Sequence, residues 1–196
     1  MRRRNRAWLD PWEATSPFGA PGDIAYGRFL KRLNAGVRRG ELMPFAVTYE
    51  GRLVGQLTVA NIVWGSACSA TIGYWVDRTV AGRGVMPTAV AMVTDHCFRV
   101  VGLHRIEINI RPENTASLRV VEKLGFRDEG VRVRLLHING AWSDHRSYAL
   151  TADEVPDGLL ARWRAAQTGD LPSPGLQPRG DQGTSAPPTA GGPDVG

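Results

Sequence analysis

The chain has 196 residues, 42% of them hydrophobic, and a formal net charge of +5 at pH 7, which fits one globular domain followed by a tail. No apolar run approaches the roughly 20 residues of a membrane span, and the basic start at Met1–Arg4 leads into Trp8 without the apolar region of a secretory signal. Two cysteines cannot form a disulfide framework, so we expect a cytoplasmic protein, with no membrane contact and, since no nucleic-acid-binding module is apparent, no direct nucleic-acid contact.

The first part of the chain predicts a helix and a β-hairpin. A Pro/Gly-rich linker at 17–23 is followed by apolar residues at helical spacing over Asp23–Arg39, which predicts an amphipathic helix. Pro44–Tyr49 and Arg52–Ile62 have the composition of strands, and Glu50-Gly51 between them is typical of a hairpin turn.

A strand, a glycine turn and a long helix stand at the centre of the chain. Ser69–Val76 is rich in aromatic and β-branched residues, which indicates a buried strand. From Val85 to about Gly102 apolar residues recur every three or four positions, which predicts a helix. The turn Gly82-Arg83-Gly84 leaves N–H groups at the positive end of the helix dipole, where phosphate binds. It lacks the Lys-Ser/Thr pair of a P-loop and the third glycine of a dinucleotide fingerprint, so these residues alone fit a plain strand–helix connection as well as a ligand site.

The rest of the domain predicts a strand, a helix and a second hairpin. Arg105–Ile110 alternates isoleucine with polar residues, the period of a strand. Asn114–Leu124 predicts a helix with Asn114 as its N-cap. Val131–Ile138 and Ser147–Leu150 flank Asn139-Gly140, the pattern of a final hairpin.

The chain is expected to end in a short helix and a tail. Asp153–Gln167 predicts the closing helix. From Thr168 onward Pro and Gly dominate and no apolar period remains, so we expect a disordered tail. The expected organisation is a domain at 1–153, a closing helix at 154–167 and a tail at 168–196.

Several motifs resemble, in their expected order, those of the Gcn5-related N-acetyltransferase (GNAT) superfamily. They are Val76–Met86 (VDRTVAGRGVM), His104–Glu107, Pro112–Ser117, Glu122–Phe126 and Asn139–His145. The set is similar to the Rim-type branch, the N-terminal acetyltransferases of ribosomal proteins, over roughly residues 5–153. Thr79 departs from the pattern, because the family usually has Gln or Arg three residues before the first glycine.

The resemblance implies an α+β fold with a mixed, mostly antiparallel central sheet flanked by helices. It also implies that this chain lacks the family's first strand and part of its first helix. Acetyl-CoA is the implied co-substrate, with no metal. The residues implied to bind it are Tyr74, Val76, Ala81, Gly82, Arg83, Gly84, Val85, Met86, Asn109, Asn114 and Ser117.

The catalytic groups follow less directly. The family uses the equivalent of Asn114 to hold the pantetheine arm, although N-capping alone also explains this residue. Ser117 is the expected general acid, since Val121 stands where many members carry a tyrosine. Glu107 is a candidate base whose other explanation is a salt bridge, and Leu136 occupies the position of a glutamate found in one Rim-type pattern.

We expect direct transfer of the acetyl group to a primary amine, with backbone N–H groups near Gly73–Trp75 stabilising the developing oxyanion. Cys97 lies on the apolar helix face, which disfavours a covalent intermediate. The expected acceptor is the N-terminal α-amino group of a protein, possibly a ribosomal one. A small-amine acetyltransferase for an antibiotic or polyamine, or a non-catalytic CoA-binding protein, are the alternatives. The expected state is a monomer or a homodimer.

Overall fold

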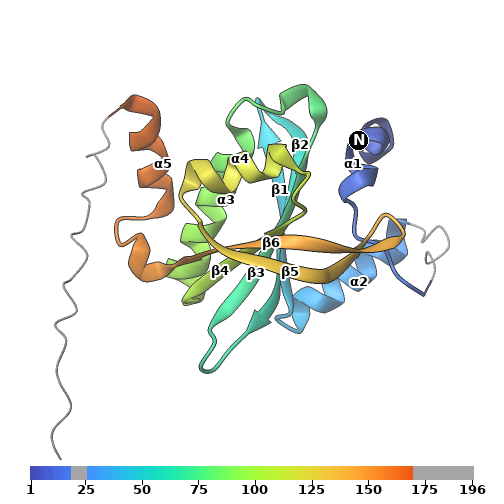
Figure 1. The fold of residues 1–196 in the computed structure, drawn as a ribbon, viewed down its shortest axis with the longest axis horizontal. Coiled ribbons are helices and arrows are strands. Elements are labelled where there is room, and N and C mark those ends of the chain that lie inside the picture. The colour runs from blue at the N-terminus through green and yellow to red at the C-terminus, as the bar shows by residue number, and fades with distance from the viewer. Residues whose placement is uncertain (19–25, 170–196) are drawn as a thin grey trace, which may run out of the picture.

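The computed structural model describes residues 1–18 and 26–169, and a six-stranded sheet forms its centre (Figure 1). The helices among these residues are α1 (Arg6–Leu9), α2 (Tyr26–Arg38), α3 (Val85–His96), α4 (Thr115–Leu124) and α5 (Leu159–Thr168). The strands are β1 (Leu42–Tyr49), β2 (Arg52–Val63), β3 (Ser69–Val76), β4 (Arg105–Ile110), β5 (Arg127–Ile138) and β6 (Ala141–Thr151). Short 3-10 turns cover Arg2–Asn5, Asp10–Trp12, Arg78–Val80 and Ala152–Glu154.

The sheet is mixed and mostly antiparallel. Its strand order is β1-β2-β3-β4-β6-β5, and of these neighbours only β3 and β4 run parallel. Strands therefore combine with helices in an α+β architecture, which confirms the predicted fold class. Among the described residues no strand precedes β1, which forms one edge of the sheet.

The two central strands, β3 and β4, are joined over only part of their length. Their parallel register runs from Ser69 opposite Arg105 to Thr71 opposite Glu107. On its other side β3 stays paired with β2 as far as Val76, while β4 pairs with β6 along its whole length. The second half of β3 thus turns an unpaired edge towards a gap in the sheet, and unpaired backbone groups are available to a ligand there.

Helices α3 and α4 bury one face of the sheet. On β4 the residues Ile106, Ile108 and Ile110 are all at most 4% exposed and belong to the same core as Val90 of α3 and Val121 of α4. Fully burying such an aliphatic side chain contributes about 1.5–3 kcal/mol. The alternating pattern of β4 that predicted a strand is therefore also what packs the helices onto the sheet.

Helix α5 covers the outer side of this helical layer. The indole Nε1 of Trp163 donates to Thr88 Oγ1 of α3 at 2.9 Å. At the start of α5, the carboxylate of Asp95 accepts hydrogen bonds from the backbone N–H groups of Leu159 (2.6 Å) and Leu160 (3.0 Å). This side chain from α3 satisfies donors that a helix N-terminus would otherwise leave free.

Residues 1–15, which we call the N-terminal segment, run from the end of β3 to the turn between β5 and β6. The indole Nε1 of Trp8 donates to the Val76 carbonyl at 3.2 Å. At the other end, the Asn139 N–H donates to the Glu13 carbonyl at 3.1 Å. The segment therefore bridges the two sides of the sheet where β3 and β4 separate, and Figure 1 shows it beside the strands, near the labelled N-terminus.

The predicted strands in the first half of the chain are confirmed with small shifts at their ends. Ser69–Val76 and Arg105–Ile110 have the predicted bounds, and Glu50-Gly51 forms the predicted turn with positive φ at both residues. In the second hairpin, β5 and β6 are longer than predicted. Most of β5 is exposed on both faces, so its sequence shows no alternation from which its start could be inferred.

The predicted helices differ from the structure mainly in where they begin and end. The predicted long helix stops as α3 at His96 and continues as a π-helical turn over Cys97–Val101. The closing helix begins at Leu159 instead of Asp153, because Gly158 is extended with a φ of 99°. The predicted start of α2, most of the linker, and the tail beyond residue 169 lie outside the described residues. No helix in the described part of the chain is long and apolar enough to cross a membrane.

Candidate active site

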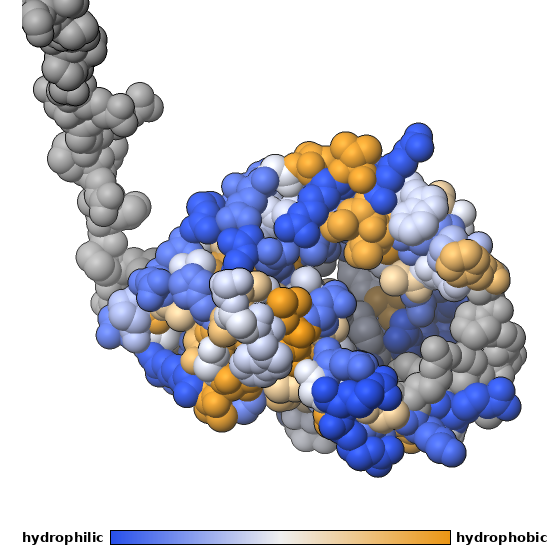
Figure 2. All heavy atoms as spheres, turned by 90° about the horizontal axis from the view of Figure 1, so that it is seen from below, coloured by the Kyte–Doolittle hydropathy of each residue, from blue (hydrophilic) through white to orange (hydrophobic). Residues whose placement is uncertain are grey.

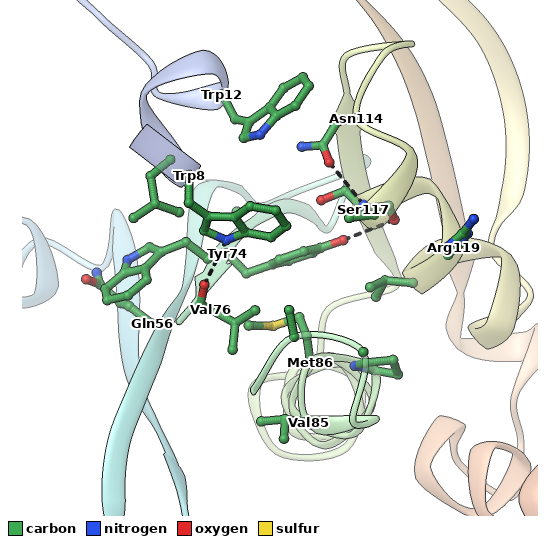
Figure 3. A pocket seen from close by; sticks show the side chains of 18 of the residues that line it. Trp8, Trp12, Gln56, Tyr74, Val76, Val85, Met86, Asn114, Ser117 and Arg119 are labelled. Atoms are coloured by element: carbon green, nitrogen blue, oxygen red, sulfur yellow. Dashed lines mark hydrogen bonds between the residues drawn. The ribbon is translucent and has the colours of Figure 1, made fainter. Parts of the chain in front are cut away.

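A cavity of about 830 Å³ lies at the gap between β3 and β4. Its walls come from β3, from the turn that leads into α3, from the start of α4 and from the N-terminal segment. Figure 3 shows side chains from all of these elements converging on one space. Figure 2 shows that the lower face of the molecule is hollowed, with hydrophobic and hydrophilic side chains on the rim.

The glycine turn places an uncapped helix N-terminus at the cavity wall. Gly82 and Gly84 both line the cavity and have φ values of 80° and 78°, a backbone region that strongly favours glycine. Gly84 is the N-cap of α3, and no side chain makes a capping hydrogen bond to that helix. Pro87 stands in the first turn, as predicted, where it has no N–H to leave unsatisfied. The turn therefore presents free N–H groups at the positive end of a helix dipole to the cavity.

Asp77 fixes the start of this turn. Its side chain is 1% exposed, and it accepts hydrogen bonds from the backbone N–H (3.0 Å) and the hydroxyl (2.8 Å) of Thr79 and from the guanidinium of Arg4. The hydrogen bond from the Thr79 backbone, the Arg4 guanidinium and the Thr79 hydroxyl hold the pKa of Asp77 far below its usual value. Thr79, the residue that departs from the family pattern, thus has a structural role under the turn.

The start of α4 brings Asn114 and Ser117 to the cavity. The Asn114 side chain accepts a hydrogen bond from the Ser117 N–H at 3.1 Å, which confirms its predicted N-cap. The phenol of Tyr74 reaches across from β3 and donates to the Ser117 carbonyl at 3.4 Å. Burial raises the pKa of Tyr74 far above its usual value, although the bond to Ser117 offsets part of this. Figure 3 shows both hydrogen bonds in the same corner of the cavity.

Most of the predicted site residues line this cavity, and three do not. The predicted residues found in its wall are Tyr74, Val76, Ala81, Gly82, Gly84, Val85, Met86, Asn114 and Ser117. Arg83 instead lines a second, smaller hollow between β1 and α3. Asn109 accepts a hydrogen bond from the Ser147 hydroxyl at 2.5 Å outside the cavity.

Glu107 also lies outside the cavity. Its carboxylate accepts from Arg105 Nε at 2.9 Å and from Arg132 Nη2 at 3.0 Å. The isoleucines that alternate with it on β4 face the helical layer, so Glu107 points to the opposite face of the sheet. The salt bridge that was the other explanation for this residue is present, and the predicted base is not where a base is needed. His145 forms a hydrogen bond to the Ser143 carbonyl at 2.9 Å, and burial lowers its pKa.

The cavity wall also contains residues that the sequence did not single out. Trp8, Trp12 and Glu13 come from the N-terminal segment, and Arg119 and Lys123 from α4. The cations of α4 follow Ser117 on the same helix at a spacing that a helical wheel could have identified. Nothing local marks the N-terminal residues, because they meet the cavity through contacts with parts of the chain about 70 to 130 positions away.

Cys97 has no part in this site. It is fully buried beyond the end of α3, and burial raises the pKa of its thiol to about 11. A thiol of this kind is not ionised near neutral pH and makes a poor nucleophile. Among the described residues, no group of three or more His, Cys, Asp or Glu side chains is arranged to hold a metal ion.

Comparison with known proteins places this geometry in a family. A family model described as Acetyltransferase (GNAT) domain matches residues 6–127. The solved structure of Mycobacterium smegmatis RimJ in complex with CoA-disulfide is 41% identical in sequence, with a TM-score of 0.78 over 85% of this chain and 81% of that chain. The ribosomal protein uS5-alanine N-acetyltransferase of Escherichia coli (strain K12) is 29% identical over 156 residues, which cover 79% of this chain and 80% of that protein.

A further relative matches over a shorter segment. The protein named "Probable N-acetyltransferase YjcK" of Bacillus subtilis (strain 168) is 41% identical over 101 residues, or 52% of this chain. The match spans 56% of YjcK, little more than half of its length.

Proposed function

The chain belongs to the GNAT acetyltransferase family, and from this premise we propose that it transfers the acetyl group of acetyl-CoA to the N-terminal α-amino group of a protein. The observation that carries the proposal is the 41% identity to RimJ across most of both chains, in a protein whose own cavity joins a glycine turn to Asn114 and Ser117. The E. coli relative, named for acting on an alanine of a ribosomal protein, supports the same class of acceptor. The proposed place of action is the cytoplasm, where ribosomal proteins are made.

The residues present fit acetyl-CoA. The uncapped N-terminus of α3, with Gly82 and Gly84 at positive φ, offers N–H donors to a pyrophosphate. Arg119 and Lys123 add positive charge to the same cavity. Beside them, the unpaired edge of β3 around Val76 has backbone groups free for the amides of the pantetheine arm. When bound, acetyl-CoA would supply the activated thioester that is transferred.

Ser117 is the group we assign to the departing sulfur. Its backbone N–H is held by Asn114 and its carbonyl by Tyr74, which fixes the residue from two sides and leaves the hydroxyl free to donate a proton. Backbone N–H groups of Gly73 and Trp75, which line the cavity, are the proposed oxyanion donors. The proposed catalytic unit is residues 1–153, with the closing helix at 154–167 packed against it and the tail at 168–196 left without a role.

The chemistry of the acceptor favours an α-amine over a lysine. An α-amino group has a reference pKa of about 7.7–8.0 and lysine one of about 10.4, so deprotonation near neutral pH costs roughly 3–4 kcal/mol less for the α-amine. Glu107, the carboxylate predicted as a base, is turned away from the cavity and bound by two arginines. A weakly assisted amine is therefore easier to use than a strongly basic one.

Acetyl transfer to matched acceptors tests the proposal. Purified protein is incubated with acetyl-CoA and a lysine-free peptide that begins with alanine, with the same peptide blocked at its N-terminus and carrying one lysine, and with a polyamine. We expect a mass increase of one acetyl group on the first peptide alone. Turnover of only the polyamine would support a small-amine acetyltransferase instead. Calorimetric binding of acetyl-CoA without turnover of any amine would support a non-catalytic CoA-binding protein.

A further inference from the structure

We propose that the carboxylate of Glu13 binds the acceptor's amine and takes a proton from it. The inference deepens the proposed function and rests on it. Two carboxylates, Glu13 and Glu113, line the cavity in the described structure, and Glu13 comes from the N-terminal segment. It therefore stands in the same cavity as Ser117, where Glu107 does not.

Glu13 is held by backbone contacts on both sides. Its own carbonyl accepts from the Asn139 N–H at 3.1 Å, and the next residue, Ala14, forms a β-bridge with Ile138. Two residues before it, the Pro11 carbonyl accepts from Arg111 Nη1 at 3.1 Å. These contacts tie the segment to the end of β4 and to the β5–β6 turn, so Glu13 is positioned by rigid elements, as a group in an active site must be.

The carboxylate itself can be released for a ligand. It pairs with Arg2 Nη2 at 2.6 Å, and both side chains are over 40% exposed. Such exposed pairs contribute little stability, so a positively charged amine can replace the arginine at small cost. The neighbouring indole rings of Trp8 and Trp12 provide apolar walls and faces that attract a cation.

Charge is distributed along the cavity in a way that suits two different substrates. Along α4 the wall runs from Glu113 just before the helix to Arg119 and Lys123, a distance of about 15 Å at the helical rise of 1.5 Å per residue. Negative groups thus gather at the start of α4, and positive groups follow along it. Trp12, which precedes Glu13, lies on the Asn114 side of the cavity in Figure 3. An ammonium is attracted to that end, and phosphates to the other.

Glu113 is the less suitable carboxylate. It is the more exposed of the two, at 61%, and pairs at 3.2 Å with Arg111 Nε. Arg111 also holds the Pro11 carbonyl, so taking Glu113 away from it would disturb the contact that positions the N-terminal segment. Glu13 can change partners without such a consequence.

The proton balance of the reaction closes with these groups. Glu13 takes one proton from the acceptor's ammonium, which leaves a neutral amine with a free lone pair. The N–C bond forms as the C–S bond breaks, and Ser117 gives its hydroxyl proton to the sulfur. The nitrogen then loses a second proton, which restores the serine. Glu13 passes the first proton to solvent, so one proton is released per acetyl group transferred.

The test is the pH profile of kcat/KM for the alanine peptide in the Glu13→Gln variant. Without a base, only the amine that is already neutral in solution reacts, so the acidic limb should move up to the pKa of the peptide's α-amine, about 8. We expect the variant to lose at least about tenfold at pH 6.5 and to approach the wild-type rate above pH 9. Acetyl-CoA affinity by calorimetry should stay within about twofold, because the phosphate end of the cavity is unchanged.

Glu41→Gln is the matched control, since the Arg39–Glu41 pair has the same 2.6 Å contact and similar exposure outside the cavity. Its profile should equal that of the wild type. An unshifted acidic limb in Glu13→Gln would overturn the inference, as would a shift seen in Glu113→Gln and not in Glu13→Gln. A wild-type protein that acetylates polyamine and no peptide would contradict the proposed function, and the same profile with polyamine would then decide the role of Glu13 separately.

Discussion

At the scale of single residues, the site depends on a few side chains that serve structure and chemistry together. Asn114 caps α4 and lines the cavity at once, and Asp77 secures the N-terminal segment through Arg4 while it supports the glycine turn through Thr79. Such residues connect the stability of the fold to the shape of the site, so their substitution has effects on both.

Asp77→Asn should destabilise the fold in a pH-dependent way. An amide keeps an acceptor for Thr79 but loses the charge that attracts Arg4, which should cost about 1–2 kcal/mol of unfolding free energy at pH 7. Folding lowers the pKa of Asp77, so its stabilisation is complete above the unfolded value of about 3.9 and declines as the pH falls below it. Urea unfolding at pH 7 and pH 3 should show the difference between the two proteins narrowing. An equal difference at both pH values would contradict this role.

Ser117→Ala should lower kcat by about 10²-fold and leave acetyl-CoA affinity nearly unchanged, because the substitution removes the proton donor and keeps the backbone N–H bound by Asn114. Tyr74→Phe removes only a 3.4 Å hydrogen bond to the Ser117 carbonyl and should cost less than about tenfold. Thiol release under saturating substrates measures both. If the phenylalanine variant loses the larger factor, the phenol and not the serine is the acid.

At the scale of elements, the glycine turn and α3 form one unit for binding an anion. Gly84→Val should abolish measurable acetyl-CoA binding, since a β-branched residue is strained at a φ of 78° and displaces the N–H groups of the turn. Gly65→Val is the matched control, because Gly65 has a φ of 73°, open space around it and a position outside the cavity. Calorimetry should detect normal affinity in the control. Normal affinity in Gly84→Val would show that the turn does not bind the phosphates.

Elements with a local signal could be predicted from the sequence, and those without one could not. The bounds of β3 and β4 follow from composition and alternation, and the N-cap of α4 from Asn114 alone. The start of β6 was missed because residues such as Asp144 and Arg146 alternate with no apolar face. The late start of α5 depends on the backbone at Gly158 and on a cap from Asp95, 64 positions away.

At the scale of the whole molecule, the site is completed by contacts between distant parts of the chain. The glycine turn and Asn114–Ser117 were identified as binding residues from motifs, and the cavity contains both. The N-terminal segment could not be assigned to the cavity in this way. Pro11 is 100 positions from Arg111 and Trp8 is 68 from Val76, and no periodicity or spacing in a sequence specifies a contact at that range.

Arg111→Lys tests whether this long-range closure forms the acceptor side of the cavity. The guanidinium of Arg111 donates to the Pro11 carbonyl at 3.1 Å, pairs with Glu113 at 3.2 Å and lies 5.7 Å from the Trp12 ring centre. A lysine ammonium keeps the charge but lacks the planar fork that makes these contacts together. The N-terminal segment should then be held less firmly over the acceptor end, while the glycine turn is unaffected.

We therefore expect KM for the alanine peptide to rise about tenfold, equivalent to about 1.4 kcal/mol, with acetyl-CoA affinity within about twofold of the wild type. Arg99→Lys is the matched control, because Arg99 also donates to a proline carbonyl, that of Pro156 at 3.2 Å, away from the cavity. Its kinetic constants should not change. Equal losses of peptide and acetyl-CoA binding in Arg111→Lys would mean that the segment supports the whole cavity and does not separate an acceptor end from a phosphate end.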